Sequence, residues 1–358
     1  SHVVVQGGTF FNEAVLRAFE RISGAQVTCP DIAGIMGAFG AALLARDRYH
    51  GQQSTMLPLE EIEQLTYKTS AARCQGCQNH CMLTVSVFPG GRRHVSGNRC
   101  EKALRGESAA KPGENIFAYK RERMFAYPPL EPENAPRGEI GIPRVLNMYE
   151  NYPFWATFFR DLGFRVILSP FSTRAIYELG MESIPSESEC YPAKLAHGHA
   201  QWLIDHGVKT IFHPCVFYEH QEVPGAQNHF NCPIVVSYPE NIKNNVEAVT
   251  DGSVRYLHPF LAFTNEKVAS DRLVQFCKEV WNIPEKETRH AAHLAWEEQR
   301  RAKADVRAAG AKALADMEKN GGSGIVLAGR PYHVDPEINH GIPELIAAYG
   351  LTVLTEDC

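Results

Sequence analysis

Three features that are common in other classes of protein are missing from this chain of 358 residues. No run of about 18 apolar residues occurs, so we expect no membrane-spanning helix. The formal net charge of -5 leaves no excess of basic residues for a nucleic-acid surface. The first residues show neither the basic segment nor the apolar stretch of a secretory signal. We therefore expect a cytoplasmic protein with neither a membrane nor a nucleic acid as partner.

Ten cysteines are present, and in the cytoplasm thiols are more often metal ligands or buried residues than disulfides. Four of them, with the spacing C-x2-C-x3-C-x18-C, are Cys74, Cys77, Cys81 and Cys100. A turn-rich loop carries three, and a predicted hairpin returns the fourth, so all four can reach one metal centre. Thiolates suit zinc or iron–sulfur, and the triplet slightly favours a 4Fe-4S cluster over zinc. Both metals remain open here.

Three more cysteines lie at junctions between predicted elements. Cys190 precedes a predicted helix, Cys215 ends a predicted strand, and Cys232 opens the run "CPIVVSYP", which we predict to be another strand. Ligands of open parallel sheets bind beyond the carboxyl ends of the strands, so these thiols are candidates for one site. Three thiols would leave one iron of a cubane cluster open. The alternative is that each is a small buried residue.

The remaining candidates carry weaker signals. Cys358 follows a predicted strand and is a further candidate ligand in a longer protein, whereas Cys29 and Cys277 are expected to be structural. We expect His197 and His199 to be either hydrogen-bonded or at the surface, rather than part of a site.

The order of predicted elements indicates an α/β fold, with Rossmann-like parallel sheets, a small Cys-rich β-hairpin metal module and a long helical segment. Apolar strands that alternate with glycine-terminated helices are typical of a parallel sheet covered on both faces. The predicted divisions are a strand–helix–helix unit (1–50), a linker with a short acidic helix (51–70), the four-cysteine module (71–106), an extended linker (107–137), an α/β domain (138–263), a helical segment (264–320) and the start of a second α/β unit (321–358).

The stretches "GIPRVLNMYENYPFWATFF", "ESECYPAKLAHGHAQWLI" and "GRPYHVDPEINHGIP" resemble the 2-hydroxyacyl-CoA dehydratase and benzoyl-CoA reductase superfamily. They look most like large fused proteins described as CoA-substrate-specific enzyme activases, and the resemblance covers nearly the whole chain. It implies an iron–sulfur cluster held by Cys190, Cys215 and Cys232. It also implies that ATP hydrolysis drives an electron, from a donor such as ferredoxin or flavodoxin, onto a CoA thioester as a ketyl radical, after which water can be eliminated.

The opening, "VVVQGGTFFNEAVLRAFE" and "GIMGAFGAALLA", looks like the last piece of an activator ATPase of the actin/hexokinase-like fold. By that resemblance, Gly7, Gly8 and Thr9 would pack against the adenosine of ATP. The rest of such an ATPase is not in this sequence. We therefore expect a fragment that is inactive alone and without ATPase activity, and that works with the rest of the same polypeptide or with partner subunits. Two alternatives remain: a zinc-stabilised scaffold without catalysis, and a CoA-ester binding module.

Overall fold

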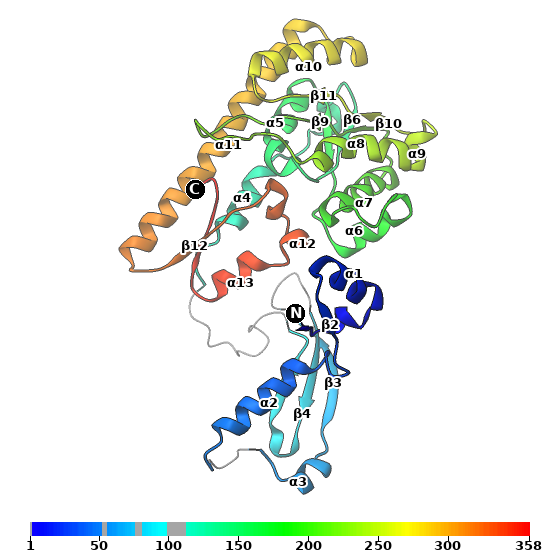
Figure 1. The fold of residues 1–358 in the computed structure, drawn as a ribbon. Helices are drawn as coiled ribbons and strands as arrows, with labels where there is room; N and C mark the ends of the chain where they lie inside the picture. The colour runs from blue at the N-terminus through cyan, green and yellow to red at the C-terminus, as the bar shows by residue number, and fades with distance from the viewer. Residues whose placement is uncertain (1, 52–55, 76–80, 99–111) are drawn as a thin grey trace. The chain divides into compact units, whose positions relative to one another are not determined.

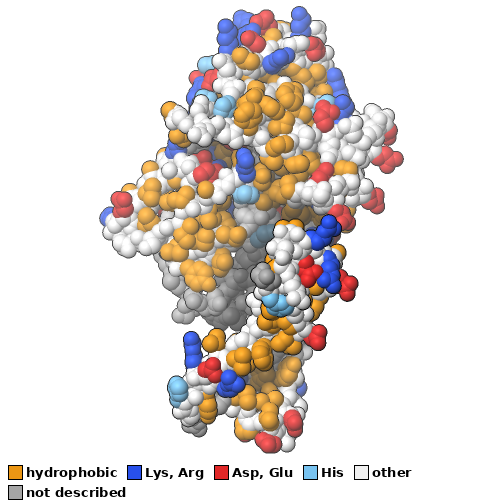
Figure 2. All heavy atoms as spheres, in the orientation of Figure 1, with side chains coloured by type: hydrophobic (Ala, Val, Ile, Leu, Met, Phe, Trp, Pro, Cys, Tyr) orange, Lys and Arg blue, Asp and Glu red, His pale blue; other side chains and the backbone are white. Residues whose placement is uncertain are grey.

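The computed structural model describes residues 2–51, 56–75, 81–98 and 112–358 (Figure 1). The chain divides into two units, residues 1–66 and residues 67–358. Within the described ranges, no helix is both long and apolar enough to cross a membrane. On the face drawn in Figure 2, Lys and Arg side chains are interspersed with Asp and Glu and form no single basic surface.

The first unit has a two-stranded parallel sheet and short helices. Its elements are β1 (His2–Val4), η1 (Gly8–Phe11), α1 (Glu13–Ser23), β2 (Gln26–Thr28), α2 (Met36–Arg48) and α3 (Leu59–Glu63). β1 pairs with β2, so that Val3 lies opposite Val27. The Asn12 side chain caps α1 by accepting a hydrogen bond from the Ala14 N–H at 3.0 Å. The predicted strand and two helices are present, whereas β2 lies where a loop was expected.

The second unit begins with a three-stranded antiparallel sheet made of β3 (Lys68–Arg73), β4 (Met82–Val87) and β5 (Arg93–Ser96). The predicted hairpin joins β4 to β5 through η2 (Pro89–Gly91), where Gly90 has a φ of +81°. β3 was not predicted, because its run "KTSAAR" has neither large apolar residues nor a clear alternation.

A four-stranded parallel sheet forms the centre of the second unit, in the order β10–β8–β6–β7. Its strands are β6 (Glu139–Ile142), β7 (Arg165–Leu168), β8 (Thr210–Phe212) and β10 (Arg255–Leu257). The helices between them are α5 (Met148–Asp161), α6 (Arg174–Leu179), α7 (Tyr191–Asp205), α8 (Pro233–Asn245) and α9 (Glu247–Thr250). Beyond the sheet, β9 (Cys215–Val216) pairs in parallel with β11 (Phe260–Leu261). The predicted parallel α/β class is confirmed.

Aromatic side chains of α5 form the core on one face of this sheet. Trp155 and Phe159 are fully buried, and their rings lie 4.6 Å and 4.8 Å from that of Phe212 in β8. Phe154 meets Trp296 at 4.6 Å. Burial of each such ring contributes on the order of 2 kcal/mol, so α5 is the main apolar anchor of the sheet.

A long helix connects this sheet to a smaller one. The elements after the central sheet are α10 (Glu266–Trp281), α11 (Glu285–Lys319), β12 (Gly324–Leu327), η6 (Pro331–Val334), α12 (Pro336–Asn339), α13 (Ile342–Ala348) and β13 (Thr352–Thr355). β12 and β13 pair in parallel, as the predicted strand–loop–helix–strand unit requires. α11 packs against α5 and α10, and also against α4 and β13. The predicted helical segment is confirmed.

The predicted extended linker is wrong in its central part, because α4 (Ile116–Met124) lies there. The Asn115 side chain accepts a hydrogen bond from the Ala118 N–H at 3.2 Å and so caps this helix. Ile116 and Phe117 are buried against the smaller sheet. The proline residues that suggested an extended chain lie outside this helix.

The predicted strand at 232–239 is also wrong, because these residues begin α8. The run "PIVVS" is rich in β-branched residues, which favours a strand locally. Val235, Tyr238 and Ile242 nevertheless fall on one face of a helix and are buried together. Burial of this face outweighed the local preference.

Candidate functional site

The carboxyl edge of the central sheet collects most of the chemically active side chains. β6 lies between β8 and β7, so the connections leave the sheet in opposite directions beside β6. Ligands of open parallel sheets bind at such a point, outside the carboxyl ends of the strands. Ser169 follows β7, Cys215 follows β8, and His258 follows β10.

Cys190 caps the N-terminus of α7, and its side chain is exposed. The residue before it is fixed on α8, because the Glu189 carboxylate accepts hydrogen bonds from the Tyr238 hydroxyl and the Asn241 amide, each at 2.7 Å. The residue after it is fixed on α12, because the Tyr191 hydroxyl donates to Glu337 at 2.8 Å. Cys190 is thus held between three helices while its thiol stays accessible.

Cys232 caps the N-terminus of α8, which packs against α7. It packs beside Tyr332 of η6 in one apolar cluster. Burial raises the pKa of the Tyr332 hydroxyl, and the nearby Cys232 and Cys190 thiols raise it further. The Tyr332 hydroxyl is therefore in electrostatic range of both thiols. Both cysteines stand at helix N-termini.

Cys215 has other neighbours. Its thiol lies within 4.8 Å of donor atoms of Glu240 and His258, and it is buried. Burial raises the pKa of this thiol to about 11, with a further rise from Glu240 and an opposing effect of Lys243. Cys215 is therefore a neutral thiol, and its neighbours are Glu240 and His258.

Two of the four clustered cysteines can be located. Cys74 follows β3, and its N–H donates to the Cys81 carbonyl at 2.9 Å, so the two residues lie side by side. Cys77 and Cys100 lie outside the described residues, so the four-thiol centre stays a prediction.

The remaining predicted residues are located as follows. Gly7 has a φ of +98°, and Gly8 and Thr9 begin η1 between β1 and α1, with open space where a side chain on either glycine would stand. Cys277 is buried on α10, as expected. Cys358 lies against Gly310 of α11.

His197 and His199, which we expected to lie outside any site, are both buried and hydrogen-bonded. Ser169 and Ser172 contact the two ring nitrogens of His199 at 2.8 Å and 2.9 Å. Burial lowers the pKa of His199 to about 3, so its ring is neutral. Ser172 also donates to the buried Asp335. This chain of hydrogen bonds joins the central sheet to the segment after β12.

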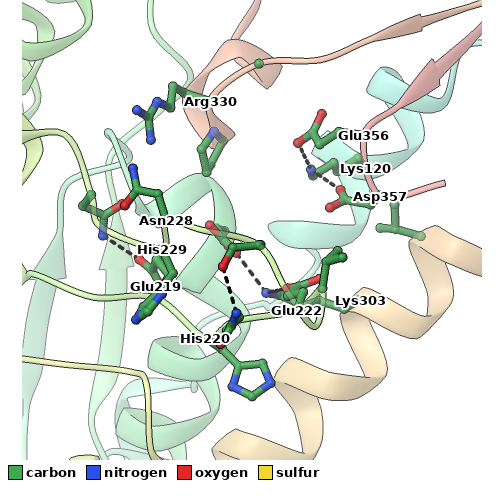
Figure 3. A pocket seen from close by; sticks show the side chains of 18 of the residues that line it. Lys120, Glu219, His220, Glu222, Asn228, His229, Lys303, Arg330, Glu356 and Asp357 are labelled. Atoms are coloured by element: carbon green, nitrogen blue, oxygen red, sulfur yellow. Dashed lines mark hydrogen bonds and ion pairs between the residues drawn. The ribbon is translucent and has the colours of Figure 1, made fainter.

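A polar cavity of about 540 Å³ opens beside this region, at the carboxyl ends of β9, β12 and β13 (Figure 3). Its lining combines both charge signs, among them Lys120, Glu219, Glu222, Lys303, Arg330 and Asp357. The sequence analysis did not select any of these residues. Glu219, Arg330 and Asp357 lie within three residues of the ends of β9, β12 and β13, whereas Lys120 and Lys303 come from α4 and α11, where no local signal marks them.

Glu219 is the most perturbed acid in the cavity. One of its oxygens, Oε1, accepts hydrogen bonds from the amides of Asn147, Asn151 and Asn231 at 2.5 Å, 3.0 Å and 2.9 Å. Burial and, to a smaller extent, the neighbouring Glu150 raise the pKa of Glu219 to about 7. A carboxyl group with such a pKa, fixed through one oxygen, is suited to exchange a proton near neutral pH.

Lys303 and Lys120 are the paired cations of the cavity. Lys303 donates to Glu150 at 2.9 Å and also to Glu222. Lys120, almost fully buried, contacts Glu356 at 3.1 Å and also Asp357. These pairs fix the walls of the cavity.

The fold and the site define an α/β protein with cysteines and a cavity at the carboxyl ends of parallel strands. The family described as "CoA enzyme activase uncharacterised domain (DUF2229)" matches residues 139–358, more than half of the chain, and the chain belongs to this family. Comparisons with curated proteins and with solved structures gave no match.

Proposed function

We propose that this chain is the iron–sulfur part of a CoA-enzyme activase system that passes low-potential electrons to a CoA thioester. The observation that carries the proposal is that Cys190 and Cys232 stand at the N-termini of α7 and α8, two helices that pack against each other, with Tyr332 in electrostatic range of both thiols. One thiol is exposed and one is half-buried, and together they would supply two of the cysteine ligands that an iron–sulfur cluster takes. Such a cluster would supply one-electron reduction.

The cavity is the proposed place for the CoA thioester. Arg330 and Pro331 line the cavity, and the next residue, Tyr332, meets the two cysteines. One short segment thus connects the two features. Glu219 would exchange a proton with the bound ester. Arg330, which makes no ion pair with any described residue, would attract its phosphates.

The other predicted parts belong to the same proposal. Cys74, Cys77, Cys81 and Cys100 would hold a second 4Fe-4S cluster or, alternatively, zinc. Gly7, Gly8 and Thr9 would contact ATP in a longer protein that includes the rest of the ATPase. Ferredoxin or flavodoxin is the kind of reduced donor that suits a low-potential centre.

The test is metal analysis of the full chain purified without oxygen. We expect iron, acid-labile sulfide and brown absorbance, and we expect Cys190→Ser with Cys232→Ser to lose about four irons per chain. Cys277→Ser is the matched control, because Cys277 is buried on α10 away from this edge. Unchanged iron and sulfide in the double variant would overturn the proposal. One zinc and no iron in the wild type would favour the alternative of a zinc-stabilised scaffold without catalysis.

A further inference from the structure

A second group of potential metal ligands lies at the carboxyl edge of the central sheet. One donor atom each of Cys215, Glu240 and His258 lies within 4.8 Å of the other two. We infer that these three residues form a mononuclear site for a zinc-like divalent cation, separate from the cluster proposed at Cys190 and Cys232. This inference gives Cys215 a role different from the one that the family resemblance implied, and it does not depend on the proposed function.

The backbone brings the three residues together from different parts of the chain. Cys215 in β9 pairs with Phe260 in β11, which places His258, two residues earlier, beside it. Glu240 comes from α8, which packs against β9. Residues before and after paired parallel strands, together with one facing helix, give a rigid arrangement of donors at the edge where ligands of such sheets bind.

The contact between His258 and Glu240 is not an ordinary hydrogen bond. The two atoms, His258 Nδ1 and Glu240 Oε1, lie 2.7 Å apart. Nδ1 is nevertheless buried without a well-oriented hydrogen-bond partner among the described residues. A ring nitrogen and a carboxylate oxygen that approach closely off the hydrogen-bond direction are arranged as two ligands of one cation would be.

The donor chemistry selects the class of cation. Thiolate, imidazole and carboxylate together suit zinc or a similar borderline ion, and not magnesium or calcium, which prefer oxygen. Donor atoms of a tetrahedral zinc site lie about 3.5 Å apart, as its bond lengths of 2.0–2.3 Å require. The half-exposed Glu240 side chain can close the remaining distance.

The surroundings resemble an outer shell of a metal site. Lys243 lies 3.6 Å from the second oxygen of Glu240 and orients the carboxylate. The Tyr256 ring stacks against His258 at 5.8 Å, and the Tyr256 hydroxyl lies 2.8 Å from Nδ1 of His213. Such partners orient the ligands. Three protein ligands leave a fourth position for water or substrate.

The test uses Co²⁺, which substitutes for zinc and gives a thiolate-to-metal absorption band. The full chain, stripped of metal by a chelator under reducing conditions, is titrated with Co²⁺. We expect the wild type to bind one equivalent more than Cys215→Ser, and Glu240→Gln and His258→Ala to weaken that equivalent by at least about tenfold, the size of effect that even an outer partner has. Cys277→Ser is the control and should bind like the wild type.

Two results would overturn the inference. One is an unchanged Co²⁺ stoichiometry and absorption band in Glu240→Gln and His258→Ala, whose partly exposed side chains make these variants safe for folding if Cys215→Ser unfolds. The other is loss of iron and sulfide from anaerobic Cys215→Ser with full retention in Glu240→Gln, which would make Cys215 a cluster ligand. Iron and sulfide that depend on Cys190 and Cys232 but not on Cys215 would leave both proposals standing.

Discussion

Tyr238 of α8 donates its hydroxyl proton to the carboxylate of Glu189, at 2.7 Å, in the loop that presents Cys190. This contact joins the N-terminus of α7 to the body of α8, and Cys232 begins the same α8. The relative placement of the two cysteines is therefore stabilised by this hydroxyl–carboxylate pair, together with the Asn241 amide that binds the same carboxylate.

Removal of this hydroxyl should loosen the Cys190 loop. We expect Tyr238→Phe to lower the free energy of unfolding by about 2 kcal/mol, because hydrogen bonds to a charged group contribute about 1.5–3 kcal/mol. Urea denaturation measures the change. Tyr177→Phe is the matched control, since the Tyr177 hydroxyl makes no hydrogen bond to a described residue, and it should change stability by less than about 0.5 kcal/mol. Equal losses of stability in Tyr238→Phe and Tyr177→Phe would contradict a stabilising hydrogen bond from Tyr238 to Glu189.

Glu219 makes stability depend on pH. Because its pKa is raised to about 7, the folded protein keeps this proton at pH values where the unfolded chain has lost it, so the folded state loses stability as pH rises from about 5 to about 8. Across this pH interval we expect the free energy of unfolding of the wild type to fall by on the order of 2 kcal/mol. The Glu219→Gln variant should not show this fall. Urea denaturation at both pH values measures it.

Glu222 is the control of opposite sign, because Lys303 and Arg307 lower the pKa of its carboxyl group against the effect of burial. Its ion pairs stabilise the fold above the ordinary pKa of glutamate and are lost as pH falls through the lowered value. At about pH 8, Glu222→Gln should therefore have a lower free energy of unfolding than the wild type. A Glu219→Gln variant with the pH profile of the wild type would show that Glu219 does not titrate near neutrality.

Gly198 in α7 should not tolerate any side chain. A Cβ there would lie 1.7 Å from the backbone carbonyl oxygen of Ile176, where α6 crosses α7. We expect Gly198→Ala to cost more than about 3 kcal/mol, because neither backbone can move without disturbing the other helix. In Gly207→Ala, by contrast, the side chain has open space and only the φ of +83° opposes it, so the cost should be about 1 kcal/mol. Thermal denaturation of both variants decides the matter, and similar losses would disprove the close crossing.

Lys120 should be essential as the counter-charge of two carboxylates. Lys120→Met leaves Glu356 and Asp357 without their buried partner, and we expect a loss of about 3 kcal/mol. Adding Asp357→Asn should restore part of it, because one uncompensated charge is then removed. A loss below about 1 kcal/mol, measured by urea denaturation, would mean that water solvates the carboxylates.

The parallel α/β class was predictable because the strands β6, β7 and β8 are short apolar runs that alternate with glycine-terminated helices. The start of α8 was not, since the β-branched residues after Cys232 favour a strand locally and only burial against α7 decides for a helix. α4 was obscured by the prolines around it.

The site was predictable only where residue type is a strong signal. Cysteines could be selected from the sequence, but which of them meet depends on tertiary contacts, and Cys215 lies with Glu240 and His258. Glu219 could not be found, because two of the three asparagines that bind its carboxylate, Asn147 and Asn151, lie about 70 residues away at the start of α5.

The uninterrupted α11 has a mechanical consequence. It packs on α5 with its first half and against α4 and β13 with its second, and at Gly310 it leaves no room for a side chain beside Cys358. A helix of 35 residues is about 52 Å long and stiff over that length. One stiff element thus connects the helix layer of the central sheet with the smaller sheet, and the same element supplies Lys303 and Arg307 to the wall of the cavity.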